Sequence, residues 1–234
     1  MTVPQMFDSI SKRYDRINRV LSLGLDLYWR KALSKHLPIK NQIKLLDCAT
    51  GTGDQLVSLL KNCLNIYDAV GMDPAQDMLS VAQPKLAPYS HCCRLVQGSA
   101  EAIPFPDEMF DVVTISFGIR NVADLKQSLK EIHRCLVPGG RLIILEFSHP
   151  SKRFLRFFHR FYLNTIVPYV GKWLSNNREA YTYLSKTIET FPQGAALAEI
   201  LKHAGFINVQ IKPLTFGTVS LYIGNRNGSS SLLS

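Results

Sequence analysis

The 234-residue sequence has few of the features that place a chain in a specialised class. Its five cysteines are an odd number without a CxxC pair, so they predict reduced thiols in a cytoplasm and neither a disulfide framework nor a zinc site. No apolar run reaches the roughly 18 residues that span a bilayer. The first twenty residues also lack the pattern of a secretory signal. We therefore expect a single globular domain with its own hydrophobic core.

Acidic residues are few relative to basic ones: the sequence has 18 aspartates and glutamates against 27 lysines and arginines, which gives a net charge of +9. The basic residues gather in segments 12–19 and 152–160, whereas segment 97–125 is acidic. Such a surplus suits nucleic acid, an anionic membrane surface or an acidic substrate. Segment 152–173 also interleaves basic with aromatic residues, as nucleic-acid sites and membrane-surface helices do. We rank a lid over the protein's own core first, a lid with membrane contact second, and nucleic acid last.

Strands and helices alternate along most of the chain. Apolar spacing predicts helices over the first forty residues, and short apolar runs predict strands at 43–47, 66–73, 93–97, 110–118 and 141–147. Helices are expected over 54–63, from Pro74 in a first-turn position, over 121–136 and over 191–205. This order is typical of a parallel sheet covered on both faces. Two last strands joined by a turn should pair antiparallel at its edge.

The same pattern predicts the domain organisation. We expect a helical cap at 1–40, a main domain at 41–226 that includes a helical lid at 151–190, and a disordered tail at 227–234.

The turn after the first strand reads DCATGTGD (47–54). Ligands of open α/β sheets bind beyond the carboxyl ends of the strands, and Gly51 and Gly53 let a ligand approach the main chain. The third glycine of a dinucleotide fingerprint and the lysine of a phosphate loop are absent. Asp47 and Asp54 flank the loop instead. Because carboxylates suit an ammonium and a sulfonium, we predict S-adenosylmethionine as the ligand.

Asp73 supports an adenosine ligand. It ends the second strand, 20 residues after Gly53, where an acid can accept hydrogen bonds from both ribose hydroxyls. The alternative is an acid at the N-terminus of the helix that follows Pro74. Taken alone, Asp73 fits both interpretations equally, and the glycine loop before it favours ribose.

The stretch 97–150, QGSAEAIPFPDEMFDVVTISFGIRNVADLKQSLKEIHRCLVPGGRLIILEFSHP, closely resembles the ubiquinone/menaquinone-biosynthesis C-methyltransferase family. YDRINRVLSLGLDLYWRK (14–31), the Tyr181-x-Tyr183-Leu184 motif and the endings GFINV and LTFGTVSLYIG also resemble it, so the similarity covers almost the whole chain. The blocks ISFGIRN and PGGRLIILEFSHP are specific to this family. The resemblance implies a Rossmann-like class I methyltransferase, with a mostly parallel seven-stranded sheet, an antiparallel edge strand and helices on both faces.

The resemblance also implies the reaction and several site residues. The reaction is methylation of a ring carbon on a polyprenyl quinol with S-adenosylmethionine, taking demethylmenaquinol to menaquinol. The positions that match the family's cofactor contacts are Thr52, Asp73, Ser99, Ala100 and Ser116. Ser99 stands where Asn is commoner and keeps a hydrogen-bonding group. Thr50 stands where Gly is commoner and narrows the loop.

The chemistry requires an electron-rich carbon. A quinol that has lost its phenolic proton is nucleophilic at the ortho carbon, and a fixed positive charge beside the oxygen favours that anion. We assign this charge to Arg120, at the end of the fourth strand, with Asn121 donating a second hydrogen bond. By spacing alone, an ion pair between Arg120 and Asp124 is equally good. His149 is a base or a loop residue, and His133 a surface or packing residue.

Some alternatives stay open at this stage. The sequence does not separate a naphthoquinol from a benzoquinol of the ubiquinone pathway or another phenolic acceptor. A non-catalytic module that binds RNA or protein on a methyltransferase fold is the rival from another class. We expect a lipophilic quinol as substrate, peripheral contact with the cytoplasmic face of the membrane and no nucleic acid. The oligomeric state, a homodimer included, is open.

Overall fold

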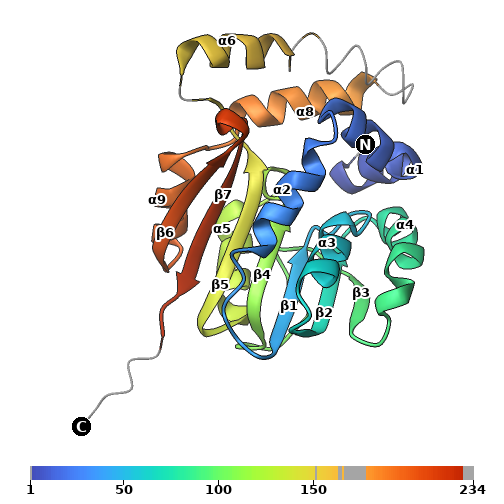
Figure 1. Ribbon diagram of the computed structural model, residues 1–234, viewed down its shortest axis with the longest axis vertical. Helices are drawn as coiled ribbons and strands as arrows, with labels where there is room; N and C mark the ends of the chain where they lie inside the picture. Colours follow the sequence, from blue (N-terminus) through green and yellow to red (C-terminus); the bar gives the residue numbers. More distant parts are fainter. Residues whose placement is uncertain (1, 151, 163–164, 166–177, 229–234) are drawn as a thin grey trace.

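A seven-stranded sheet forms the centre of the computed structural model, which describes residues 2–150, 152–162, 165 and 178–228 (Figure 1). The strand order is β3-β2-β1-β4-β5-β7-β6. The strands are β1 (Ile43–Cys48), β2 (Ile66–Asp73), β3 (Cys93–Gln97), β4 (Phe110–Ser116), β5 (Leu136–Phe147), β6 (Phe206–Leu214) and β7 (Val219–Arg226). The first five are parallel, and β7 runs antiparallel to β5 and β6. The prediction of a mostly parallel seven-stranded sheet with an antiparallel pair at its edge is confirmed.

Helices cover both faces of this sheet (Figure 1). One face packs against α2 (Leu25–Ser34), α3 (Asp54–Asn62) and α4 (Gln76–Leu86). The other face packs against α5 (Leu125–Cys135) and α9 (Ala195–His203). Leu45 and Leu46 are both fully buried, yet they belong to the two opposite cores, because successive strand residues point to opposite faces. This two-sided burial explains why the strands are almost continuously apolar.

Three helices lie above the carboxyl ends of the parallel strands: α1 (Val3–Leu21), α6 (Arg153–Phe161) and α8 (Arg178–Thr190) (Figure 1). A third core of Ile10, Ile17 and Ile188 joins α1 to α8. Of the residues assigned to the lid and tail, 151, 163–164, 166–177 and 229–234 lie outside the described part of the chain. No helix in the described part is long and apolar enough to cross a membrane.

Several element boundaries differ from expectation: α5 begins at Leu125 and not at residue 121, α9 begins at Ala195 and not at residue 191, and β4 ends at Ser116 and not at residue 118. Helix α4 begins at Gln76, so Pro74 precedes the helix and does not lie in its first turn. Strand β5 begins at Leu136 and not at Arg141, because Leu136 pairs with Phe110 before a register shift resumes the ladder at Val112 and Arg141. The five cysteines are free thiols, of which Cys48 and Cys135 are buried.

Candidate active site

A cavity of about 660 Å³ opens at the carboxyl ends of β1, β2 and β4, a volume in the usual range for small-molecule sites. The sequence analysis predicted ten catalytic or cofactor-binding residues, and eight of them line this cavity: Gly51, Thr52, Asp73, Ser99, Ala100, Ser116, Arg120 and Asn121. Asp47 and Gly53 lie outside its lining. We call this space the polar cavity.

Gly51 shapes the floor of the polar cavity. Its φ is +56°, a conformation that side chains rarely adopt, and a Cβ built there meets no atom within 4 Å. The open space beside its backbone is room for a ligand. The Gly51 N–H donates to Asp73 Oδ2 over 2.8 Å, which ties the loop after β1 to the end of β2.

Gly53 serves packing rather than the cavity. Its φ is +80°, it is the N-cap of α3, and a Cβ there would lie 3.1 Å from the Cβ of Ala82 in α4. The absence of a side chain therefore lets α3 and α4 approach each other. Asp54, the second acid beside the loop, lines the cavity but pairs with Lys85 at 2.7 Å.

Asp47 lies beneath the loop and is 1% exposed. The hydroxyls of Thr50 and Thr114 each donate to one of its carboxylate oxygens. Burial raises the pKa of Asp47 to about 6, against the lowering effect of these hydrogen bonds. Asp47 thus stabilises the loop from inside the protein through its hydrogen bond with Thr50. Thr50, the residue that departs from the family pattern, supplies one of the two hydroxyls.

Asp73 lines the polar cavity and is 7% exposed. One carboxylate oxygen accepts from Gly51 N and the other from Ala75 N, which is the N-cap of α4. Burial raises its pKa to about 6, although these two hydrogen bonds lower it. Asp73 therefore bonds the N-cap of α4, as one interpretation expected, and the same side chain lines the polar cavity.

Ser99, Ala100, Ser116 and Asn121 complete the polar wall. The Ser116 hydroxyl donates to Gln55 Oε1 over 3.0 Å, so β4 and α3 are linked at the cavity. Asn121 keeps a buried side-chain oxygen that has no hydrogen-bond partner among the described residues. Buried polar atoms are normally paired, so Asn121 has hydrogen-bonding capacity left for a ligand.

Arg120 forms an ion pair with Glu146, so the alternative prediction of an ion pair with Asp124 was wrong. Its guanidinium donates to Glu146 Oε1 over 2.7 Å and to the Phe117 carbonyl over 2.6 Å, and it lies 5.2 Å from the Phe147 ring centroid. The side chains of Arg120 and Glu146 are 4% and 1% exposed. Asp124 instead caps α5 by accepting from Gln127 N.

The sequence reasoning missed Glu146. The available signal was a carboxylate inside the apolar run LIILEF of β5, where a buried charge requires a partner. Burial raises the pKa of Glu146 while the Arg120 guanidinium lowers it. The two residues meet because β4 and β5 are parallel neighbours with Ser116 opposite Leu145.

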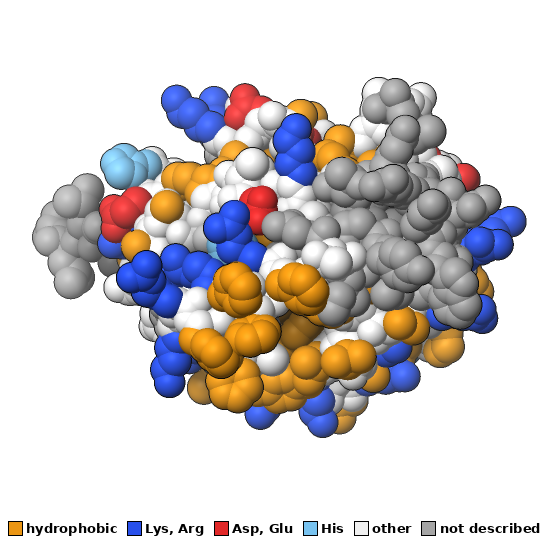
Figure 2. Space-filling view, turned by 90° about the horizontal axis from the view of Figure 1, so that it is seen from above, with side chains coloured by type: hydrophobic (Ala, Val, Ile, Leu, Met, Phe, Trp, Pro, Cys, Tyr) orange, Lys and Arg blue, Asp and Glu red, His pale blue; other side chains and the backbone are white. Residues whose placement is uncertain are grey.

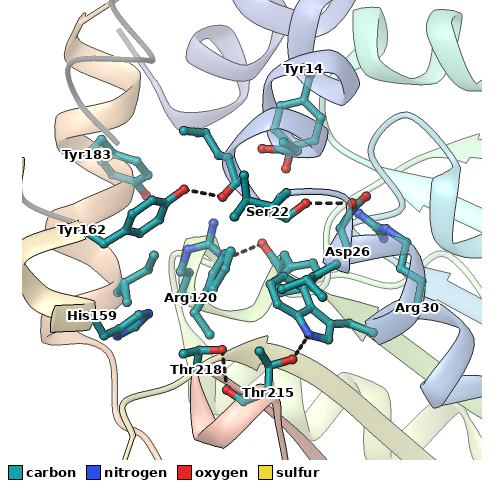
Figure 3. A pocket seen from close by; sticks show the side chains of 18 of the residues that line it. Tyr14, Ser22, Asp26, Arg30, Arg120, His159, Tyr162, Tyr183, Thr215 and Thr218 are labelled. Carbon is teal, nitrogen blue, oxygen red and sulfur yellow. Dashed lines mark hydrogen bonds between the residues drawn. The ribbon is translucent and has the colours of Figure 1, made fainter. Parts of the chain in front are cut away.

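A second cavity of about 290 Å³ lies beside the first, and we call it the apolar cavity. Its walls come from α1, α2, α6, α8 and the ends of β4, β5 and β7. Six residues line both cavities: Phe7, Tyr14, Arg30, Phe117, Arg120 and Tyr183. In Figure 3, Arg120 projects into the apolar cavity, with Tyr162 and Tyr183 on one side and Asp26 on the other.

Of the histidines in this part of the molecule, only His159 lines one of the two cavities, and the sequence analysis did not name it. His149 lines neither cavity, and His133 packs edge-on against Phe206. His159 of α6 does line the apolar cavity, and burial lowers its pKa to about 4, so its imidazole is neutral near pH 7. No local motif marked His159, because its neighbours in space come from distant segments.

Comparison with known proteins identifies what this geometry resembles. The model of the ubiE/COQ5 methyltransferase family matches residues 1–226. The chain is 42% identical over 221 residues to demethylmenaquinone methyltransferase of Thermus thermophilus, covering 94% of this chain and 100% of the relative. It is 39% identical over 222 residues to ubiquinone/menaquinone biosynthesis C-methyltransferase UbiE of Syntrophotalea carbinolica, covering 95% and 93%.

Solved structures share the fold. An S-adenosylmethionine-dependent methyltransferase of Thermotoga maritima superposes with a TM-score of 0.66 at 20% identity, over 95% of this chain and 99% of that one. Phosphoethanolamine N-methyltransferase 2 of Haemonchus contortus, solved with S-adenosylmethionine, gives 0.62 at 15% identity, over 85% and 52%.

Proposed function

Since the chain belongs to the ubiE/COQ5 methyltransferase family and is an S-adenosylmethionine-dependent methyltransferase, we propose that it methylates a ring carbon of demethylmenaquinol to give menaquinol. One observation carries this proposal. The polar and apolar cavities share the lining residues Arg30 and Arg120, so a methyl donor in one and an apolar aromatic acceptor in the other lie beside the same cationic side chains. The names of the relatives agree with this acceptor.

The polar cavity fits S-adenosylmethionine. Gly51 leaves open space beside the main chain, Asp73 presents an acceptor for ribose hydroxyls, and Asn121 has an unpartnered polar atom. Ser99, Ala100 and Ser116 would form the wall beside the adenosine. When bound, the cofactor supplies a methyl group made electrophilic by its sulfonium.

The apolar cavity suits a naphthoquinol ring and the start of its tail. Trp29, Phe117 and Phe147 form a packed aromatic wall with centroid separations of 4.7 to 6.4 Å. Aromatic walls of this kind favour flat, apolar ligands. A tail that is insoluble in water also places the reaction next to a membrane, so we infer that the enzyme works at the cytoplasmic membrane surface.

Arg120 is the residue that activates the acceptor in this proposal. Its guanidinium stays protonated, so it stabilises the quinolate oxygen and does not remove the proton itself. Glu146 and the Phe117 carbonyl hold it in one orientation. Its Nε has no partner among the described residues, which leaves donor capacity for the acceptor. Asn121 contributes a second polar contact from the same turn, η2 (Ile119–Asn121).

The test is direct incubation. The protein with labelled S-adenosylmethionine and reduced demethylmenaquinol should yield a product methylated on the ring, detected by mass spectrometry. A parallel arm supplies the ring-demethylated benzoquinol of the ubiquinone pathway. Transfer only to the benzoquinol would reassign the acceptor, and transfer to neither quinol would refute the proposal. Arg120→Met is the matched variant, expected to bind cofactor but turn over slowly.

A further inference from the structure

Helix α6 presents an unusual apolar face. Phe154, Phe157, Phe158 and Phe161 are spaced so that all four lie on one side of the helix, and they are 72%, 68%, 52% and 54% exposed. A different side, about a third of a turn away, carries Leu155, His159 and the C-cap residue Tyr162, of which the last two line the apolar cavity. The helix therefore covers the cavity with one side and exposes four aromatic rings with another.

Two further apolar side chains are exposed on tight turns of the same end of the molecule. Leu23, between α1 and α2, is 84% exposed at φ +52°. Phe216, in η4 (Thr215–Gly217), is 82% exposed at φ +57°. Side chains of this size rarely adopt positive φ, and strained residues cluster at functional sites. Leu23 and Phe216 therefore both have an unfavourable backbone conformation and an exposed apolar side chain.

Helix α6, the turn at Leu23 and η4 each contribute residues to the wall of the apolar cavity. Leu23 and Leu25 line that cavity although both are exposed, and Tyr162 and Thr215 line it from α6 and η4. The Tyr162 hydroxyl donates to the Leu21 carbonyl, which joins α6 to the turn at Leu23. The exposed Leu23 is therefore also part of the wall of the apolar cavity, and α6 carries the four phenylalanines together with two further wall residues.

Basic residues border this surface. Lys152, Arg153, Arg156 and Arg160 occupy the start and one side of α6, next to the phenylalanine side. Arg160 lies 3.4 Å from Glu189 and remains 60% exposed. Figure 2, which looks onto this end of the molecule, shows apolar side chains gathered together with Lys and Arg side chains at their margin. A helix with aromatic rings on one side and basic groups beside them is suited to an anionic interface.

We propose that the surface formed by the four α6 phenylalanines, Leu23 and Phe216 docks onto a bilayer containing anionic phospholipid. The rings enter the boundary between headgroups and acyl chains, and the basic margin faces the anionic headgroups. This proposal rests on the proposed function in one respect, since a prenylated quinol could then pass from the bilayer into the apolar cavity without crossing water.

The experiment is vesicle sedimentation with the full chain. Wild type should bind vesicles of phosphatidylcholine and phosphatidylglycerol, and the double variant Phe157→Glu/Phe161→Glu should bind at least about tenfold more weakly. The matched control is Ile39→Glu/Leu64→Glu, which adds the same charge at two fully exposed apolar residues that precede β1 and β2, at the opposite end of the sheet. The control should bind like wild type.

Charge is tested separately. Lys152→Gln/Arg153→Gln should weaken binding to phosphatidylglycerol vesicles by about fivefold per charge and leave binding to pure phosphatidylcholine unchanged. The control Lys126→Gln/Lys130→Gln, on exposed positions of α5, should not weaken it comparably. Equal losses in both pairs would mean that net charge alone drives binding, and would overturn the assigned surface.

Two readouts separate this proposal from the proposed function. All variants should keep wild-type turnover on a water-soluble quinol without a prenyl tail, and wild-type failure on that quinol would refute the function while leaving the vesicle result intact. Unchanged vesicle binding by the phenylalanine variant would refute the surface. A concentration-dependent dimer in ultracentrifugation that this variant abolishes would assign the surface to a second copy of the chain instead.

Discussion

The buried pair of Arg120 and Glu146 yields the sharpest prediction. At 2.7 Å and an effective dielectric constant of about 20, the attraction is roughly 6 kcal/mol, and desolvation of two buried ions offsets several kcal/mol of it. The net contribution of the intact pair is therefore small. Removing one partner is different, because it leaves the other charge buried without compensation, at a cost of about 3–5 kcal/mol.

The two single variants should differ in how stability depends on pH. Glu146→Gln leaves a guanidinium that cannot deprotonate and removes the carboxyl group that titrates, so this pair should add no pH dependence to the variant's unfolding free energy. Arg120→Met leaves Glu146, whose pKa burial raises. Between the unfolded pKa and that raised pKa, the folded state holds a proton that the unfolded chain has released. Stability should therefore fall as pH rises, by up to about 1.4 kcal/mol per pH unit.

Urea unfolding across pH 5 to 8, a range of roughly three units, measures both effects. The double variant Arg120→Met/Glu146→Leu should be more stable than either single variant. Additivity of the single losses within about 0.5 kcal/mol, or parallel pH profiles for the two, would refute a coupled buried ion pair. Turnover adds a second readout, because Arg120→Met should lower kcat by about 10²–10³-fold while adenosylhomocysteine affinity stays close to wild type.

Four further predictions concern Asp73 and the loop after β1. Asp73→Asn should weaken adenosylhomocysteine binding by about 5- to 150-fold in calorimetry, and unchanged affinity would remove Asp73 from the site. Ribose hydroxyls donate to the ionised carboxylate, and burial raises the Asp73 pKa to about 6. The affinity of wild type for adenosylhomocysteine should therefore be full above that pH and fall by up to about tenfold per pH unit below it. An affinity that does not change with pH would contradict this. Thr50→Val should lower the unfolding free energy by about 1–3 kcal/mol by leaving an Asp47 oxygen unpaired, whereas Thr50→Ser should be near wild type, and equal losses would argue against the hydrogen bond. Gly53→Ala should destabilise by about 1–2 kcal/mol, since its φ is +80° and Ala82 lies 3.1 Å away, and thermal unfolding unchanged from wild type would contradict that packing role.

Much of the fold could be predicted because its causes are local. The five parallel strands carry near-continuous apolar runs, a glycine turn follows β1, and an acid, Asp73, ends β2 at the polar cavity. Asp73 and the turn at Gly51 could be predicted for the same reason, because each lies at the end of a strand or in the loop directly after one. The structure joins the two by a hydrogen bond.

Other features depended on which segments the fold brings together. Asp47 stands beside the glycine loop in sequence, but the strand directs it inward to Thr50 and Thr114, so proximity in the chain did not reveal its role. Glu146 is 26 residues from Arg120 and meets it only through the register of β4 and β5.

The amino-acid sequence alone determined the order of elements, the two-sided sheet and the glycine loop that lines the polar cavity, because hydrophobic periodicity and backbone freedom act over a few residues. The tertiary structure decided that α1, α6 and α8 converge above the strand ends, that Arg120 has Glu146 as its partner, and that four phenylalanines of α6 face outward. Those outcomes depend on strand register and helix packing across the whole chain, which no local pattern encodes.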